Sequence, residues 1–376
     1  MMSSESMTSE ERYQAAIRLE KPDRVPVAPL MSTFAATVIL GLDYAKIMAE
    51  GPEAQLEAEV QLFDMFGGWD AFSPIAPPDG YRLGGLNVKL PDGRVQELQI
   101  LETENMKEED YDIIPELGWN KFMSGHLLPR IMDVEEPGSL RQKVVDIMNM
   151  LNKSVDVYGQ RGAVPMYFTW RQHPFFQISL MRSMVKFTED IYYRPEKVEK
   201  VMEAAVPQFI EASIRQCKAS GVMVANCIEE RAGAFFYPPE VFERFWWPYT
   251  QQIVDAFWSE GIVTWFHIDT CWDKNIPYFK KLPRGSAIID LDGTTDIFRA
   301  KEILRDHLCI ATDVHPALLS LGKPEEVEAY CKKLIDEVGG DGGCILTTGC
   351  TVPGAVKPEN FRAFVETGKN YEFSKP

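Results

Sequence analysis

Short apolar runs alternate along the chain with longer stretches in which apolar positions recur every three or four residues. Each run is rich in β-branched or aromatic residues and ends in polar ones, as strands that are buried on both faces do. The pattern predicts eight strands, at residues 24–30, 69–75, 163–170, 221–230, 261–269, 286–292, 308–314 and 343–350.

The stretches between these runs predict amphipathic helices, of which three are clearest. Residues 195–220 begin with a proline, which suits the first turn of a helix. Residues 238–260 show the same period, and so do residues 323–340, which Gly339 and Gly340 would end. Strands that alternate with helices indicate a parallel sheet covered by helices.

Eight such strands favour a (β/α)₈ TIM barrel, which needs roughly 250 residues plus insertions. A doubly wound sheet would more often show a glycine fingerprint after its first strand, and none follows Leu30. Residues 80–134, in which PDGRVQELQI suggests a hairpin turn, would join N-terminal helices as elaborations of the barrel. Since no linker or repeat divides the sequence, we expect one barrel domain over residues 1–376.

Composition and charge narrow the class of partner. Hydrophobic residues make up 45% of the 376 residues, as in ordinary globular proteins. The formal charge of −17 repels phosphate backbones and anionic lipid, so we expect no nucleic-acid or membrane partner. The first residues show no signal peptide, and the seven cysteines are irregularly spaced, which favours reduced thiols in the cytoplasm. A homodimer is left open.

Polar residues at the predicted strand ends are the candidates for chemistry, because active sites of TIM barrels lie there. His267 and Asp269 are two residues apart, so both would point to the same side of their strand end. Cys350 follows Gly349 in a turn at the last strand end. Imidazole, carboxylate and thiolate are zinc donors, although capping of a strand end is the alternative role for each residue.

The segment Asp313-Val314-His315 begins like the D-x-H motif with which corrinoid carriers bind cobalt. Pro316 follows it, however, and Leu318 stands where that motif has glycine. A turn capped by Asp313 is the better interpretation.

With these residues in place, the chain resembles the uroporphyrinogen decarboxylase superfamily and, within it, the corrinoid-dependent methyltransferase branch. The resemblance runs from ERYQAAIRLEKPDRVPVAP (11–29) through FHIDTCWD (266–273) to the block at 322–366, which contains GCILTTGCTVP and KPEN. It implies a (β/α)₈ barrel.

The decarboxylases and the methyltransferases of the superfamily differ in their sequence motifs. Decarboxylases resemble one another in an M-R-Q-A-G-R segment after the first strand, since a substrate with many carboxylates needs guanidinium partners. Residues 31–40, MSTFAATVIL, contain no arginine, and the acidic net charge also disfavours such a substrate. Methyltransferases of the branch resemble one another as zinc enzymes. Their zinc ligands are a histidine, a cysteine two residues later and a second cysteine in the G-C-x-x-P turn.

His267 and Cys350 match two of these ligands, whereas Asp269 replaces the third, a cysteine. This departure favours an oxygen-linked methyl group over a thiol, because zinc with fewer thiolates is a harder Lewis acid. We therefore expect a zinc enzyme that moves a methyl group from a methyl ether, such as a methoxylated aromatic, to the cobalt(I) of a separate corrinoid protein. The zinc ligands would be His267, Cys350 and a carboxylate, for which Asp269 is the first candidate and Glu230 the second. His267, Asp269 and Glu230 would also be the catalytic residues.

Apolar side chains near the strand ends are candidates for holding the ring of the methyl donor. Each could equally belong to the core; they are Met31, Tyr167, Trp170, Phe176 and Trp265. Three other functions remain open. They are transfer from a methylcorrinoid to tetrahydrofolate or a thiol, uroporphyrinogen-type decarboxylation, and a non-catalytic barrel that binds a tetrapyrrole.

Overall fold

The computed structural model describes residues 6–91, 97–132, 138–168 and 171–373. The first half of the chain is mainly helical. Its helices are α1 (Ser9–Ile17), α2 (Thr33–Leu40), α3 (Tyr44–Glu50), α4 (Pro52–Met65), α5 (Pro78–Leu83), α6 (Asp110–Leu117), α7 (Trp119–Phe122), a π-helical turn (Met123–Leu127), α8 (Leu128–Ile131) and α9 (Ser139–Gly159). Those of the second half are α10 (Pro174–Arg182), α11 (Met184–Tyr193), α12 (Pro195–Ser220), α13 (Pro239–Phe245), α14 (Trp247–Ser259), α15 (Ile276–Phe279), α16 (Ile297–Leu304), α17 (Pro316–Leu321), α18 (Pro324–Glu337) and α19 (Pro358–Asn370).

The strands form a parallel barrel with one antiparallel hairpin beside it. They are β1 (Ala71–Phe72), β2 (Asn87–Lys89), β3 (Gln99–Leu101), β4 (Val164–Pro165), β5 (Val224–Glu229), β6 (Val263–Ile268), β7 (Ala287–Leu291), β8 (Cys309–Ala311) and β9 (Cys344–Ile345). Strands β5 to β9 pair in sequence order, and β1 pairs with β4, all in parallel. Isolated parallel bridges from Val27 to Leu346 and from Gln172 to Ile228 join these two sheets.

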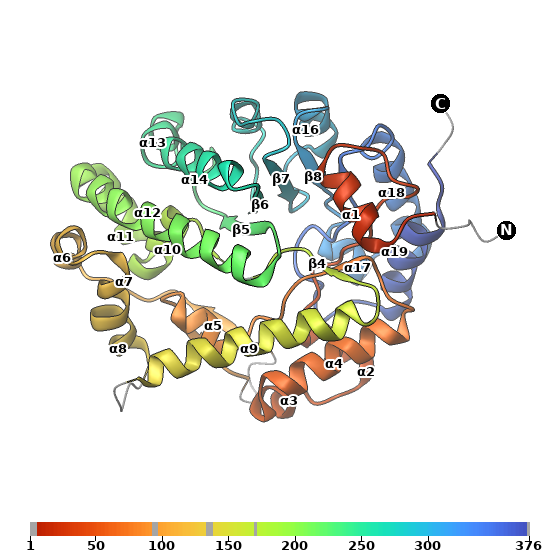
Figure 1. Cartoon of the computed structure of the whole chain (residues 1–376), viewed down its shortest axis with the longest axis horizontal. Helices are drawn as coiled ribbons and strands as arrows, with labels where there is room; N and C mark the ends of the chain where they lie inside the picture. The colour runs from red at the N-terminus through yellow and green to blue at the C-terminus, as the bar shows by residue number, and fades with distance from the viewer. Residues whose placement is uncertain (1–5, 92–96, 133–137, 169–170, 374–376) are drawn as a thin grey trace.

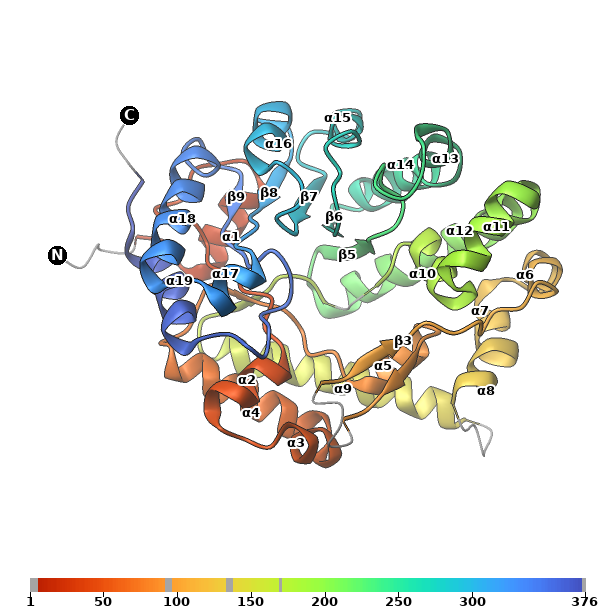
Figure 2. The same cartoon turned by 180° about the vertical axis from the view of Figure 1, so that it is seen from behind.

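The residues around Val27 complete the ring of eight strand positions. The Ala28 N–H donates to the Leu346 carbonyl at 2.8 Å, and on the other side the Asp70 N–H donates to the Val27 carbonyl at 2.9 Å. The predicted TIM barrel is therefore confirmed. Helices such as α12, α14, α16 and α18 surround the long strands in both views, while α4 and α9 cover the opposite side (Figures 1 and 2).

All eight predicted strands are shorter than the sequence pattern suggested, and β8 is reduced to Cys309–Ala311. Residues 24–30 contribute only the bridge at Val27, and residues 69–75 and 163–170 contribute two-residue strands. Prolines explain two of these differences, because a proline cannot donate to the ladder: Pro26 and Pro29 lie in the first segment, and Pro74 lies in the second. The last strand also covers only Cys344–Ile345, although it continues as bridges at Leu346 and Thr348.

The helix predictions are largely confirmed. Helix α12 spans Pro195–Ser220, as its period predicted, and α18 ends just before Val338 and the two glycines. The single helix expected at residues 238–260 is wrong, because the chain forms α13 and α14 with a break at Trp246. Pro248 has no N–H and disfavours a regular helix across this point, whereas it is tolerated in the first turn of α14, where it lies.

The elaboration between the early strands is also confirmed. Strands β2 and β3 pair antiparallel, with Val88 opposite Ile100, and the predicted turn at residues 92–96 lies outside the described residues. Together with α2, α3, α4 and α5, this hairpin stands on the side of the barrel opposite to α14 and α16 (Figure 2). The first half of the chain therefore supplies a wall over the barrel opening.

None of the helices in the described residues is long and apolar enough to cross a lipid bilayer. All seven cysteines carry free thiols in the structure.

Candidate metal site at the carboxyl end of the barrel

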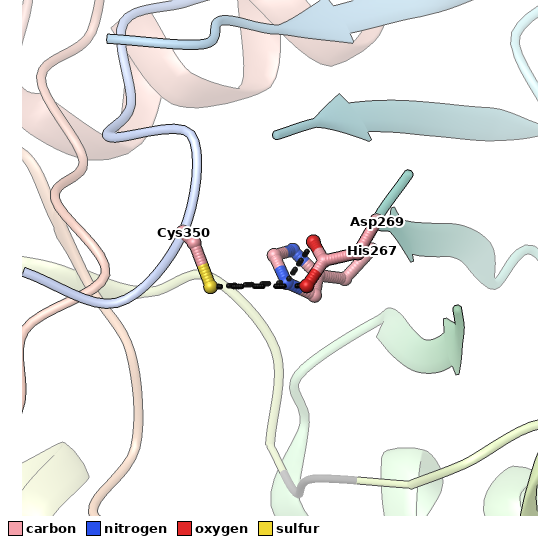
Figure 3. A group of neighbouring side chains, drawn as sticks. All are labelled: His267, Asp269 and Cys350. Atoms are coloured by element: carbon pink, nitrogen blue, oxygen red, sulfur yellow. Dashed lines mark hydrogen bonds and ion pairs between the residues drawn. The ribbon is translucent and has the colours of Figure 1, made fainter. Parts of the chain in front are cut away.

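Three potential metal ligands meet at the carboxyl ends of the barrel strands. One ligand atom from each of His267, Asp269 and Cys350 lies within 4.8 Å of the others. Figure 3 shows His267 and Asp269 projecting from the end of β6 toward the thiol of Cys350, which comes from the loop after β9. The Cys350 Sγ lies 4.0 Å from both His267 Nε2 and Asp269 Oδ2.

The strand pairing of the barrel places His267. Strand β6 is buried along its whole length and pairs in register with β7, so His267 lies beside Asp290. The Nδ1–H of His267 donates to Asp290 Oδ2 at 2.7 Å. Because Nδ1 is held in this way, Nε2 faces Asp269 and Cys350, which is the arrangement that metal-binding histidines show.

Asp290 is fully buried and is itself held by its neighbours. The indole N–H of Trp265 donates to Asp290 Oδ2 at 3.0 Å. Burial raises the pKa of Asp290, and the neighbouring His267 partly opposes this shift. Burial alone would lower the pKa of His267, but the charge of Asp290 and hydrogen bonds to both aspartates raise it well above its ordinary value.

A strained turn follows β6 and fixes the position of Asp269. Thr270 has a φ of +70°, which is rare for a β-branched residue. Its N–H donates to Asp292 Oδ2 at 2.8 Å, so the turn is held by the end of the next strand. The Asp269 Oδ1 atom is buried and forms an ion pair with His267 Nε2 at 3.2 Å.

Gly349 allows the loop that bears Cys350 to approach the barrel closely. A Cβ at this position would lie 2.9 Å from the backbone oxygen of Asp292. We predicted a tight turn here, and the structure shows that the glycine is required by backbone packing at this point. Any larger residue would displace the Cys350 loop.

The donor set fits zinc. A nitrogen, a thiolate sulfur and a carboxylate oxygen are its usual ligands, and three protein ligands leave a fourth position for substrate. The buried carboxylate of Asp269 and the orientation of His267 Nε2 toward it both suit a bound cation. An ion that binds there would displace the proton on Nε2.

The site opens into a cavity of about 450 Å³, which His267, Cys350 and Glu230 help to line. Glu230 lies outside the group of three ligands. Burial, and secondarily the charge of Asp269, raises the pKa of Glu230 to about 7. Glu230, the second candidate for the carboxylate ligand, is thus close enough for the charge of Asp269 to affect its pKa. Asp269, however, is the carboxylate that lies with His267 and Cys350 in the ligand group.

The predicted substrate-binding residues divide into two groups. Met31 and Phe176 line the cavity. Tyr167 and Trp265 do not line it, because both are buried inside the barrel, where their ring centroids lie 5.6 Å apart. Trp170 lies outside the described residues.

Two kinds of residue escaped the sequence analysis. Asp290 was assigned no role, although a carboxylate within the apolar run AIIDL was a signal of a buried role. Gln55 and Glu59 of α4 also line the cavity, and nothing in their local sequence separated them from an exposed helix face.

The motif rejected as a cobalt ligand has a structural role. His315 precedes α17, and its Nδ1 accepts a hydrogen bond from the Ala317 N–H at 3.0 Å. Asp313 accepts one from the Tyr330 hydroxyl at 2.8 Å. Both residues therefore stabilise the strand end locally.

Residues 172–371 match the family described as uroporphyrinogen decarboxylase (URO-D). The matched segment is more than half of the chain and includes all three candidate ligands. The chain belongs to the URO-D family. The family that the sequence motifs suggested is thereby confirmed.

Relatives within this family have different activities. A methylcobamide:CoM methyltransferase, MtbA, of Methanosarcina mazei is 30% identical over 178 residues, which are 46% of this chain and 51% of that protein. A uroporphyrinogen decarboxylase of Geotalea daltonii is 25% identical over 176 residues, 47% of this chain and 50% of that protein. The chain thus spans about half the length of the curated relatives that it matches.

A solved structure extends the comparison to the whole fold. The structure of a methyltransferase from Methanosarcina mazei superposes with a TM-score of 0.70, covering 96% of this chain and 98% of the other, at 16% identity. At this identity the likeness establishes the fold.

Proposed function

We propose that this protein is a zinc-dependent methyltransferase that moves a methyl group from a methyl ether to the cobalt(I) of a separate corrinoid protein. The observation that carries the proposal is the group of His267, Asp269 and Cys350 at the mouth of the barrel, beside a cavity for a small molecule. Likeness to a methylcobamide:CoM methyltransferase supports the transfer of a methyl group.

The reaction breaks the bond between the methyl carbon and oxygen and forms one between the methyl carbon and cobalt. The electron pair of the broken bond stays on the leaving oxygen. Zinc held by His267, Asp269 and Cys350 would supply Lewis acidity at that oxygen. With one thiolate and one carboxylate among the three ligands, the site favours a hard oxygen donor over a sulfur nucleophile.

The residues of the chain orient the reacting groups. Asp290 holds His267 so that its Nε2 faces Asp269 and Cys350, where the zinc would be held. The Glu230 carboxyl, whose pKa burial raises to about 7, can give a proton to the released oxygen. Met31 and Phe176 supply apolar contacts for the ring of a methoxylated aromatic.

We place the methyl acceptor on another protein, because the D-x-H segment of this chain does not complete the cobalt motif. His315, the histidine of the incomplete cobalt motif, caps α17 through its Nδ1. A corrinoid protein that docks over the mouth of the barrel would bring its cobalt to the methyl carbon from the side opposite the zinc ligands.

A second candidate function is transfer from a methylcorrinoid to a thiol, which the name of the MtbA relative favours. Asp269 weighs against it, because the thiol-transferring members that the sequence resembles have cysteine at this position. Decarboxylation of a polycarboxylate is less well supported. Among the described residues that line the cavity, Arg231 is the single arginine or lysine, and it is paired with Glu102 at 3.3 Å.

The test combines zinc analysis with an assay of methyl transfer. Purified protein is mixed with a reduced corrinoid protein and a panel of methoxylated aromatics, methylamines and methyl thiols, and methylation is followed by the visible spectrum of the corrinoid. We expect one tightly bound zinc and methylation with a methoxylated aromatic. His267→Ala should lose both the zinc and the methyl transfer. His126→Ala, which changes an exposed histidine outside the candidate ligand group, should retain both.

Three results would overturn the proposal. Less than one equivalent of zinc, with unaltered ligand binding in His267→Ala, would favour a non-catalytic binding protein. Methylation only from methylamines or methyl thiols would exclude the ether. Consumption of a methylated corrinoid by tetrahydrofolate or a thiol, without the forward reaction, would favour transfer in the opposite direction.

A further inference from the structure

One face of α4 lines the cavity with polar side chains. Gln55 and Glu59 are one helical turn apart and are only 1% and 2% exposed, yet both border the cavity that contains His267 and Cys350. Residues four apart lie on the same face of a helix. This turn of α4 therefore presents an amide and a carboxyl group to the ligand space.

These two side chains have hydrogen-bonding capacity that the protein does not use. The Thr33 hydroxyl donates to Glu59 Oε1 at 2.6 Å, and Gln55 Nε2 lies 3.2 Å from the Met48 sulfur. Within the described part of the chain, no group donates to Glu59 Oε2 or Gln55 Oε1. Because both residues border the cavity, these oxygens can be paired with a ligand or with water there.

The charge of the cavity disfavours anions. Four carboxyl groups line it, and the single arginine or lysine among its described lining residues is Arg231, which is paired with Glu102; the four are Glu59, Glu97, Glu102 and Glu230. Burial raises the pKa of Glu59 to about 8, so this carboxyl is mainly uncharged at neutral pH and can both donate and accept a hydrogen bond. An uncharged ligand with a hydroxyl group suits such a partner better than a carboxylate does.

Aromatic side chains form other parts of the cavity wall. Phe34, Tyr44, Tyr81 and Phe176 border it together with Met31. Burial raises the pKa of Tyr81 to about 12, so its hydroxyl stays protonated. The wall is suited to a flat apolar ring, with polar contacts at the α4 face and at the metal ligands.

We propose that Glu59, with Thr33 and Gln55 beside it, binds the hydroxyl group of an uncharged hydroxylated aryl methyl ether while the methoxy group lies at His267, Asp269 and Cys350. This inference rests on the proposed function for the identity of the methoxy group. It makes Glu59 the residue that selects methoxyphenols over methoxybenzoates and over aryl ethers that have no hydroxyl group.

The test measures binding, which does not depend on methyl transfer. Isothermal titration calorimetry of the zinc-loaded protein compares 2-, 3- and 4-methoxyphenol with anisole, 4-methoxybenzoate and tetramethylammonium. We expect the best methoxyphenol to bind at least about 10-fold more tightly than anisole, because anisole leaves the hydrogen bond to Glu59 unmade. Binding of 4-methoxybenzoate and tetramethylammonium should be weaker still.

Variants assign the preference to Glu59. Glu59→Met should reduce the preference for methoxyphenol over anisole to about 2-fold or less while leaving anisole binding unchanged, because only the hydrogen bond is lost. Glu97→Gln is the matched control, since it removes another cavity carboxyl that is not on α4, and it should retain the preference. If Glu59→Met does not fold, Glu59→Gln, which keeps a donor and an acceptor, should retain the preference, and the ranking of the ligands by the wild-type protein decides the question.

Equal binding of anisole and methoxyphenol would overturn the inference, and so would tighter binding of 4-methoxybenzoate or tetramethylammonium. Equal weakening of every ligand by Glu59→Met would show a purely structural role. The experiments distinguish failure of the two proposals. If binding is selective and depends on Glu59 but no methyl transfer occurs, the proposed function is wrong. If methyl transfer occurs from anisole or methoxybenzoate with no preference for methoxyphenol, only this inference is wrong.

Discussion

The two ends of the barrel differ in the side chains that surround their buried acidic groups. At the amino end, Asp70 is 1% exposed and lies between Arg12 at 2.6 Å and Arg24 at 2.5 Å. Arg12 also pairs with Asp23 at 2.7 Å. At the carboxyl end, Asp269, Asp290 and Glu230 surround His267.

The difference shows which end is built for stability and which for binding. The pKa of Asp23 is lowered to about 2: burial opposes the shift, but hydrogen bonds and charge from Arg12 outweigh it. Burial raises the pKa of Glu230 to about 7 and that of Glu59 to about 8. Acidic groups that arginines neutralise hold the fold together, whereas those without arginine can bind a cation or a ligand.

Removal of the central carboxylate at the amino end should have the largest effect. Asp70→Asn leaves two buried guanidinium groups on either side of a neutral amide, and the loss of one partner from a buried ion pair costs about 3–5 kcal/mol. Urea unfolding should show this decrease in the free energy of unfolding. Zinc content of the folded variant should stay at one equivalent, because the substitution lies at the opposite end. A loss below about 1 kcal/mol would mean that these pairs contribute no more than exposed ones.

A matched substitution at the carboxyl end should affect metal binding more than stability. Asp290→Asn weakens the hydrogen bond that orients His267, and changes of this kind lower metal affinity or activity about 10–100-fold. Competition with a zinc chelator gives the affinity. Asp313→Asn is the control, since Asp313 is a buried strand-end carboxyl that bonds to Tyr330 outside the ligand group. Equal loss of affinity in both variants would contradict a specific role for Asp290.

The two ends should also respond oppositely to pH, with the smallest effect at Asp23. The lowered pKa of Asp23 contributes stability above its ordinary value of 3.8, and this is lost as the pH falls toward about 2. We expect about 1 kcal/mol, since Asp23 is partly exposed to solvent. The raised pKa of Glu59 acts in the other direction: stability is full below its ordinary value of 4.5 and declines as the pH rises toward about 8.

Urea unfolding across this pH range tests both signs. Asp23→Asn should flatten the acidic side of the stability profile, and Glu59→Gln should flatten the side between about pH 5 and 8. If both variants flatten the same side, the contrast between the two ends is wrong.

The local sequence predicted much of the fold because periodicity is a local property. Helix α12 appears with the predicted bounds, and β6 is buried at every position, as its apolar run indicated. Where prolines interrupt the pattern, the prediction was less accurate: the strand at residues 24–30 is reduced to a bridge, and the helix at residues 238–260 is divided. In both places a missing N–H outweighed the apolar period.

The sequence alone determined the alternation of strands and helices, the family, and the arrival of His267, Asp269 and Cys350 at strand ends. Only the tertiary structure decided that the Cys350 Sγ lies 4.0 Å from His267 Nε2, although the two residues are 83 positions apart. It also decided that Asp290 is the hydrogen-bond partner of His267. It also placed Gln55 and Glu59 of α4 on the wall of the same cavity. The physical reason is that distances between side chains on different strands depend on strand register and on closure of the barrel, which arise from contacts between residues far apart in the chain.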